Sequence, residues 1–147
     1  LIVCNSPNSR LGNHMNVKVL RDFRDIFVGN PDCFSPEEIP CELKTLLKQP
    51  ILMLSSKSTT SEYLHQMFAT HGLNLLPEVE LNSNDLLMDL ARIGLGIACI
   101  PDYMLNPDDS LKPIPLADPL PPRQLVLVQH DSLPLSQAAE RFLDMFS

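Results

Sequence analysis

The chain has 147 residues, of which 44% are hydrophobic and 20% charged, a composition typical of a globular protein with a substantial core. The formal net charge of −7, with only 11 scattered Lys and Arg residues, argues against direct binding of nucleic-acid phosphates by this region. No apolar run reaches the roughly 18 residues of a transmembrane segment, and no signal-peptide pattern is visible.

Residues 1–31 predict three short strands. The first, LIVCN (1–5), is an apolar run of the kind found in buried parallel strands, and 6–16 is a turn-rich loop. The alternation over 17–31 predicts two short strands with a bend near Arg21–Asp22. Because the chain opens in mid-strand, we expect it to be a piece of a longer protein.

Helices and strands alternate over the rest of the chain, which predicts an α/β fold with a largely parallel sheet. In order, the expected elements are a loop and short helix (35–50), a strand (51–54), a helix (59–73), a strand (78–81), a helix ending at Ile93, a strand (96–101), a proline-rich connection (107–122), a strand (123–130) and an amphipathic helix (135–146) capped by Ser136.

Polar residues and glycines mark the ends of the two longer helices. Thr59 with Glu62 predicts a capping box for the first, and Asn82 or Ser83 caps the second. Gly72 and Gly94 follow the last helical turns as expected for helix C-termini. With Gly96, Gly94 predicts an abrupt turn that packs the second helix tightly against a buried strand.

Enzyme and metal motifs are absent, so we expect no catalytic activity, no metal and no cofactor. The sequence contains no GxSxG, P-loop, HExxH or GxGxxG motif. The four cysteines form no CxxC; Cys4 and Cys99 lie in apolar runs, which favours buried thiols. Cys33 and Cys41 flank a proline-rich loop and leave a redox pair open as an alternative.

Small polar side chains cluster at two helix N-termini, each directly after a predicted strand. The clusters are SSKSTTS (55–61), with six hydroxyls among seven residues, and NSND (82–85). Helix N-termini at strand ends favour anions, so hydroxyls and an amide there predict a cage for a carboxylate or other small anion. The candidate ligands are Ser55, Ser56, Ser58, Thr59 and Asn82. Plain N-capping by Thr59 and Asn82, with ordinary loop polarity for the other hydroxyls, remains an alternative.

The ordered series of elements resembles the effector-binding domain of bacterial LysR-type transcriptional regulators over nearly the whole chain. The most specific part is GLGIACIP, within RIGLGIACIPDYM. LIVCN, DIFVGNPD and RQLVLVQHDSLPLSQAAERFLDMF are similar to the family's first strand in this region, its crossover strand, and its closing strand with the final helix.

The resemblance implies a fold like that of type 2 periplasmic binding proteins, with two Rossmann-like lobes joined by two crossing strands. Lobe one would comprise 1–27 and 124–147 and be incomplete in this chain, and lobe two would comprise 28–123. The family's winged helix-turn-helix and linker helix would precede residue 1, so that DNA is contacted only through that part.

The resemblance also implies a cytoplasmic ligand sensor that works as a homodimer or homotetramer, not at a membrane. Its small-molecule effector, polar or anionic and a carboxylate among the candidates, would lie between the lobes. Carried over by position, the contacts are Ser55, Thr59, Asn82, Tyr103 and, from lobe one, Asn5. Some family members have Arg where Asn5 stands, so its absence weighs against a dicarboxylate. The alternatives are a solute-binding protein serving a transporter and a thiol-based redox sensor within the regulator family.

Overall fold

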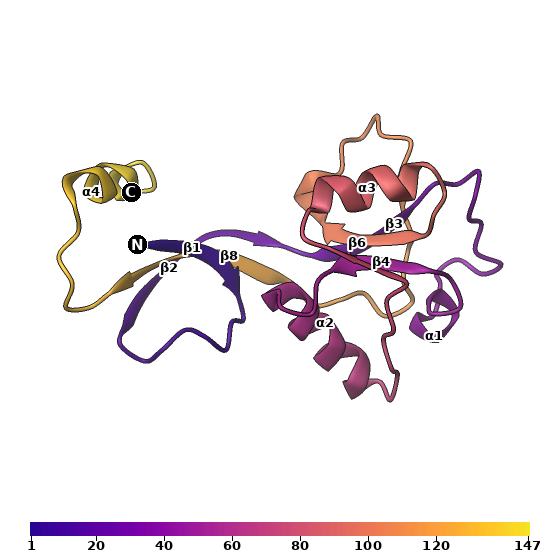
Figure 1. Cartoon of the computed structure of the whole chain (residues 1–147), viewed down its shortest axis with the longest axis horizontal. Helices are drawn as coiled ribbons and strands as arrows, with labels where there is room; N and C mark the ends of the chain where they lie inside the picture. Colours follow the sequence, from indigo (N-terminus) through magenta and orange to yellow (C-terminus); the bar gives the residue numbers. More distant parts are fainter. The chain divides into compact units, whose positions relative to one another are not determined.

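The computed structural model describes residues 1–147, which divide into two compact units, Leu1–Phe23 with Pro122–Ser147, and Arg24–Pro121. The first unit contains β1 (Ile2–Ser6), β2 (Met15–Phe23), β8 (Arg123–His130) and α4 (Gln137–Asp144) (Figure 1). Its three strands form an antiparallel sheet in the order β1-β8-β2.

The prediction that β1 is a buried parallel strand is wrong. β1 pairs antiparallel with β8, and the side chains of Leu1, Ile2 and Val3 are exposed. An apolar run predicts a strand, but it does not specify the direction of the neighbouring strand. Burial of these side chains would require a covering layer, and no residue of α4 is buried.

Strand β2 contains a β-bulge, and beyond it the alternation of side chains between the two faces of the sheet is reversed. Val19 is opposite Val126 and Arg21 is opposite Leu125, which leaves Leu20 as the additional residue. Beyond the bulge, Phe23 is opposite Arg123, and both side chains are buried. The Arg123 guanidinium lies 5.0 Å from the centroid of the Phe23 ring. The bend predicted near Arg21–Asp22 therefore has a structural counterpart, although the strand continues to Phe23.

The second unit is a five-stranded sheet covered by helices, with the strand order β5-β4-β6-β3-β7. Its elements are β3 (Asp25–Gly29), α1 (Leu43–Leu46), β4 (Ile51–Leu54), α2 (Thr59–Thr70), β5 (Val79–Leu81), α3 (Asn84–Arg92), β6 (Ile97–Pro101), the 3₁₀ helix η1 (Asp102–Met104) and β7 (Lys112–Pro113). Strands β5, β4 and β6 are parallel, whereas β3 and β7 are antiparallel to their neighbours. The expected largely parallel sheet is thus mixed, because β3 runs against β6 and pairs with β7 at the edge of the sheet.

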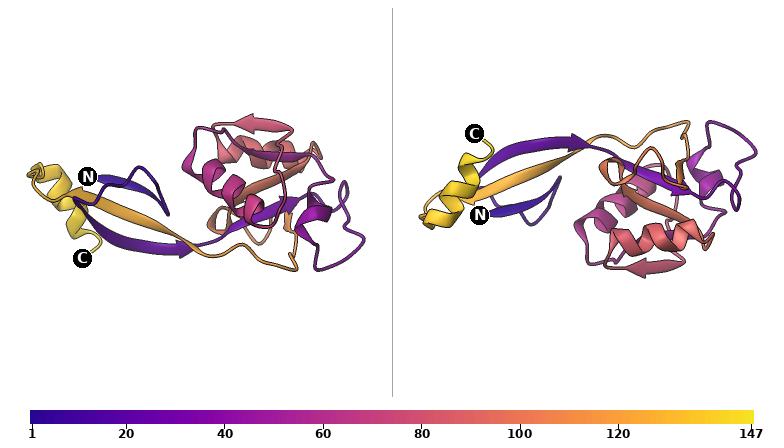
Figure 2. Two further views of the ribbon diagram at one scale, coloured as in Figure 1. Left: turned by 90° about the horizontal axis from the view of Figure 1, so that it is seen from below. Right: turned by 90° about the horizontal axis from the view of Figure 1, so that it is seen from above.

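Helix α3 covers one face of this sheet and helices α1 and α2 cover the other (Figures 1 and 2). The buried strands β4 and β6 are apolar on both faces, as expected for strands between two helical layers. Ile51 and Met53 contribute to the core under α2, and the intervening Leu52 contributes to the core under α3.

The predicted helix C-termini are confirmed, but one of the predicted N-caps is wrong. Gly72 and Gly94 have φ angles of 69° and 82°, the left-handed conformation expected after a last helical turn. Ser58 rather than Thr59 caps α2, because the Ser58 hydroxyl accepts the Ser61 amide and Thr59 is already helical. The tight turn is also confirmed, because a Cβ at Gly96 would lie 2.5 Å from the carbonyl oxygen of Pro50.

The proline-rich connection 107–122 contains a strand that the sequence did not predict. Residues Lys112–Pro113 form β7 beside β3, and Leu116 forms an isolated bridge with Cys41.

None of the helices in either unit combines the length and the apolar composition needed to span a lipid bilayer.

Candidate functional site

The two predicted polar clusters lie side by side at the carboxyl ends of neighbouring strands. Leu54 at the end of β4 is opposite Leu81 at the end of β5, in parallel pairing. The Ser55 amide donates a 2.9 Å hydrogen bond to the Leu81 carbonyl oxygen, so Ser55 follows one strand where Asn82 follows the other. The two clusters therefore share one edge of the sheet, as a cage built from both would require.

Strand β6 adds a third end to the same edge. Its parallel register with β4, in which Leu52 is opposite Ala98, places Pro101 and η1 at the carboxyl edge. Tyr103, in η1, is 41% exposed. The Asp102 amide donates a 2.8 Å hydrogen bond to the carbonyl oxygen of Arg24, which brings the start of β3 to this edge as well. We refer to the edge formed by 55–59, Asn82 and Asp102–Met104 as the carboxyl edge.

Most of the candidate side chains at the carboxyl edge are not used to cap the helices. The Ser58 hydroxyl accepts the Ser61 amide at 3.0 Å, and the Ser83 hydroxyl accepts the Leu86 amide at 3.3 Å. The hypothesis that Thr59 and Asn82 are plain N-caps is therefore wrong. The side chains of Ser55, Ser56, Thr59 and Asn82 form no hydrogen bond within the protein, so a ligand could use their polar atoms.

Helix dipoles and a lysine make this edge favourable for negative charge. Helix α2 has 12 residues and α3 has nine, and both begin here with their first backbone N–H groups outside the intrahelical pattern. Lys57, exposed in the turn before α2, adds a cation that the sequence interpretation overlooked because it counted hydroxyls. The carboxylates nearby, Glu62 and Asp85 in the first turns and Asp102 in η1, are exposed to solvent and oppose this effect.

Two asparagines outside the carboxyl edge, Asn84 and Asn5, are also candidates for ligand contact. Asn84, which the sequence interpretation also passed over, is the first residue of α3, and its Oδ1 atom is buried without a hydrogen-bond partner. Such an acceptor would suit a ligand or water that donates a hydrogen bond. Asn5 lies in β1 of the other unit, half-buried and opposite Leu125, and its role as a ligand contact stays a prediction.

No disulfide joins the four cysteines. Burial, followed by the charges of Glu42 and Glu38, raises the pKa of the Cys41 thiol, and its side chain is inaccessible. Cys33 is exposed. No group of three His, Cys, Asp or Glu side chains is arranged to hold a metal ion.

Comparison with known proteins identifies a family whose model matches nearly the whole chain. The model of the LysR substrate binding domain family matches residues 2–147.

Solved structures share the fold at low sequence identity. The regulatory domain of CcmR from Synechocystis PCC6803, in complex with 2-PG, superposes with a TM-score of 0.82 at 16% identity, covering 98% of this chain and 70% of that one. The effector binding domain of QuiR in complex with shikimate gives 0.80 at 13% identity, covering 97% and 68%. HinK, a LysR family transcriptional regulator from Pseudomonas aeruginosa, gives 0.74 at 15% identity, covering 98% of this chain and 51% of HinK.

Proposed function

The chain belongs to the LysR substrate binding domain family, and from this premise we propose that it is the ligand-sensing domain of a LysR-type transcriptional regulator. The acidic net charge of −7 fits a domain that leaves DNA contacts to another part of the full protein. DNA binding through a winged helix-turn-helix and assembly into a homodimer or homotetramer belong to the same proposal.

The effector of this proposal is a small polar or anionic molecule, bound at the carboxyl edge. Ser55, Ser56, Ser58, Thr59, Asn82 and Tyr103 are the proposed contacts in this unit, and Asn5 is the proposed contact in the other. Similar structures with 2-PG and with shikimate support this chemistry, since small effectors are bound by domains of the same fold. An effector that binds one conformation more tightly than another would shift their populations, which is the basis of sensing.

The observation that carries the proposal is the hydrogen bond between the Ser55 amide and the Leu81 carbonyl oxygen, at 2.9 Å. It joins the ends of β4 and β5 and brings two helix N-termini and several uncommitted polar side chains to one edge. A single anion could then be bound by groups from two separate segments of the chain. In open α/β sheets, ligands bind at the carboxyl ends of the strands.

The test is a thermal-shift titration of the 147-residue chain with shikimate and with 2-PG. A ligand at about 100 times its Kd stabilises the folded state by about 2.7 kcal/mol, which a melting curve detects. We expect a concentration-dependent rise in Tm for at least one of them. The double variant Ser55→Ala/Thr59→Ala should lose that response, because it removes two hydroxyls that no helix cap requires.

The matched control removes two hydroxyls elsewhere in the same unit. Thr45→Ala/Ser110→Ala changes a residue of α1 and a loop residue, both outside the carboxyl edge, and should leave the response intact. An unchanged response in Ser55→Ala/Thr59→Ala would remove the site assignment. A response to neither compound would exclude both as effectors.

A further inference from the structure

A pocket of about 380 Å³ lies beside β3, within the second unit, and no residue of the carboxyl edge lines it. We propose that this pocket binds a small apolar carboxylate, with Arg24 as the partner of the carboxylate group. We call it the Arg24 pocket. Its apolar walls are formed by Ile26, Phe27, Ile114, Leu116 and Leu120. The proposal does not rest on the function proposed above, because none of the candidate effector contacts lines this pocket.

The sheet leaves this space open because β7 is short. β7 pairs with β3 only at Val28 and Gly29, and one further hydrogen bond joins the Ile114 amide to the Phe27 carbonyl oxygen at 2.8 Å. Beyond this point the chain leaves the edge of β3. Pro115 and Pro119, which also line the pocket, have no N–H with which to continue a strand ladder. The first half of β3 therefore borders a pocket instead of another strand.

The far wall of the pocket is held in place without a ligand. The Cys41 amide donates to the Pro115 carbonyl oxygen at 2.7 Å, and the Ala117 amide donates to the Cys41 carbonyl oxygen at 2.9 Å. Cys41, Ile114 and Leu120 are all buried in the core beneath α1 and α2. A volume of about 380 Å³ with apolar walls is in the range of small-molecule sites, and a fixed wall reduces the entropy cost of binding.

The cation at the pocket is the guanidinium of Arg24. Arg24 is exposed, its Nη1 donates to the Leu120 carbonyl oxygen at the long distance of 3.5 Å, and it forms no ion pair. Asp25 also lines the pocket, but it is only 2% exposed. An apolar cavity beside an accessible guanidinium complements a molecule with an apolar body and a carboxylate, which Arg binds in a bidentate geometry.

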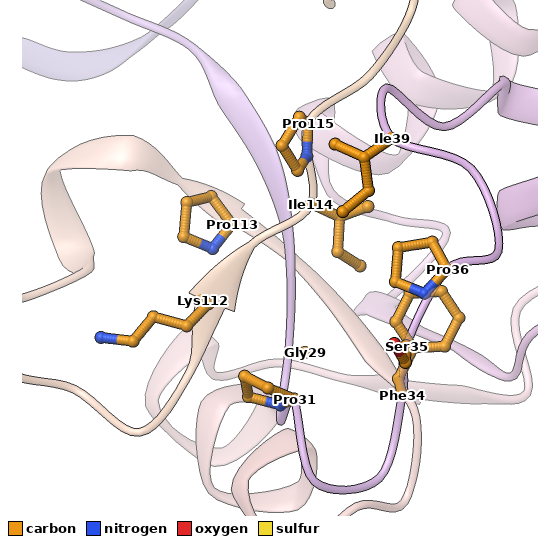
Figure 3. A pocket seen from close by; sticks show the side chains of 10 residues that line it. All are labelled: Gly29, Pro31, Phe34, Ser35, Pro36, Ile39, Lys112, Pro113, Ile114 and Pro115. Atoms are coloured by element: carbon orange, nitrogen blue, oxygen red, sulfur yellow. The ribbon is translucent and has the colours of Figure 1, made fainter.

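A neighbouring cavity provides the contrast that favours the Arg24 pocket. This second cavity, of about 200 Å³, shares the segment Pro113–Pro115 and is closed on its other side by Phe34, Pro36 and Ile39 (Figure 3). The Lys112 amine, its one charged group, donates to the Pro107 carbonyl oxygen at 3.3 Å and is directed away from Phe34 and Ile39 (Figure 3). This second cavity is smaller than the Arg24 pocket, and its lysine amine points away from its apolar wall (Figure 3).

The test compares two probes of the same shape, 3-phenylpropionate and 3-phenylpropionamide, by calorimetry and by NMR of the 147-residue chain. We expect the carboxylate to bind more tightly than the amide and to shift the amide resonances of 25–27 and 114–120. Arg24→Gln should reduce the affinity for the carboxylate about tenfold and leave that for the amide nearly unchanged. Leu116→Ser, which lowers the apolarity of the wall, should weaken both probes.

Arg141→Gln, which removes an exposed arginine of α4, is the matched control and should bind both probes like the unmodified chain. Three results would overturn the proposal. These are no binding of 3-phenylpropionate, resonance shifts confined to residues outside the pocket, or an Arg24→Gln variant that still prefers the carboxylate. Because Ser55→Ala/Thr59→Ala leaves the pocket intact, its binding of 3-phenylpropionate should be normal even if the effector proposal fails.

Discussion

Arg92 at the end of α3 and Asp109 in the following connection form a bidentate ion pair, with nitrogen–oxygen distances of 3.1 and 2.7 Å. The Arg92 guanidinium, together with the Leu111 amide, lowers the pKa of Asp109 from 3.8 to about 2. The Arg92 carbonyl oxygen accepts the Asn30 side-chain amide at 2.7 Å, so the pair joins three segments. It is therefore a structural contact, separate from both proposed ligand sites.

Asp109→Asn should destabilise the chain by about 1–2 kcal/mol at neutral pH. The folded-state pKa is depressed, so the stabilisation is present above the ordinary value of 3.8 and is lost as the pH falls through about 2. Urea denaturation from pH 7 downwards should show the two proteins converging in stability over that range. Asp108→Asn, which changes a neighbouring carboxylate that forms no ion pair, should have little effect at any pH. A constant difference at all pH values would contradict this interpretation.

Gly94→Ala should destabilise the chain more than Gly72→Ala. Both glycines have positive φ angles, but a Cβ at Gly94 would lie 2.5 Å from the Cys33 Sγ, whereas a Cβ at Gly72 meets nothing within 4 Å. The conformational cost of about 1 kcal/mol applies to both substitutions, and the steric cost applies only to Gly94. Thermal melts of the two variants should show the difference. Adding Cys33→Gly to Gly94→Ala should restore part of the lost stability, and no recovery would contradict the steric explanation.

Asp118→Asn should lower the pKa of His71, which sits at the end of α2. The Met67 carbonyl oxygen and then the Asp118 carboxylate, 2.7 Å from the His71 Nε2, raise this pKa above 6.5. Any stabilisation from the raised pKa is present below 6.5 and is lost as the pH rises through the folded-state value. An NMR titration of the imidazole resonances should show a decrease that is only partial, because Met67 remains. An unchanged titration would mean that the pair does not form in solution.

Iodoacetamide should label Cys33 fastest of the four cysteines in the folded chain. Cys33 is exposed, whereas Cys41 and Cys99 are buried, and burial raises the pKa of the Cys41 thiol. Mass spectrometry of tryptic peptides should therefore show early modification at Cys33, and denaturant should expose the rest. The redox hypothesis for Cys33 and Cys41 is tested by counting thiols after peroxide. Loss of both together would support it, and no loss would exclude it.

Much of the fold could be predicted from local patterns in the second unit. Strand β4 has the predicted bounds 51–54, and strand β8 has the predicted bounds 123–130. Gly72 and Gly94 correctly predicted the ends of α2 and α3, because few residues other than glycine adopt a positive φ. The family resemblance is confirmed by the match over residues 2–147.

The direction of β3, the strand β7 and the exposure of β1 could not be predicted, because they depend on pairing partners distant in the sequence. The adjacency of Ser55 and Asn82 was predictable from strand order. The choice of Ser58 over Thr59 as the cap was not, because it depends on one backbone angle where several hydroxyls follow one another. The Arg24 pocket likewise results from where β7 ends, which no local pattern indicates.

The additional residue Leu20 allows a single strand to serve two surfaces. Val17 and Val19 share one face of β2, and Phe23 lies on the opposite face with Arg123. A strand of uniform alternation would place Phe23 and the two valines together, and the aromatic partner of Arg123 would be lost. An insertion or deletion of one residue at Leu20 should consequently move the side chains of one half of this strand to the opposite face of the sheet. The same change in the 6–14 turn would alter only the length of the loop.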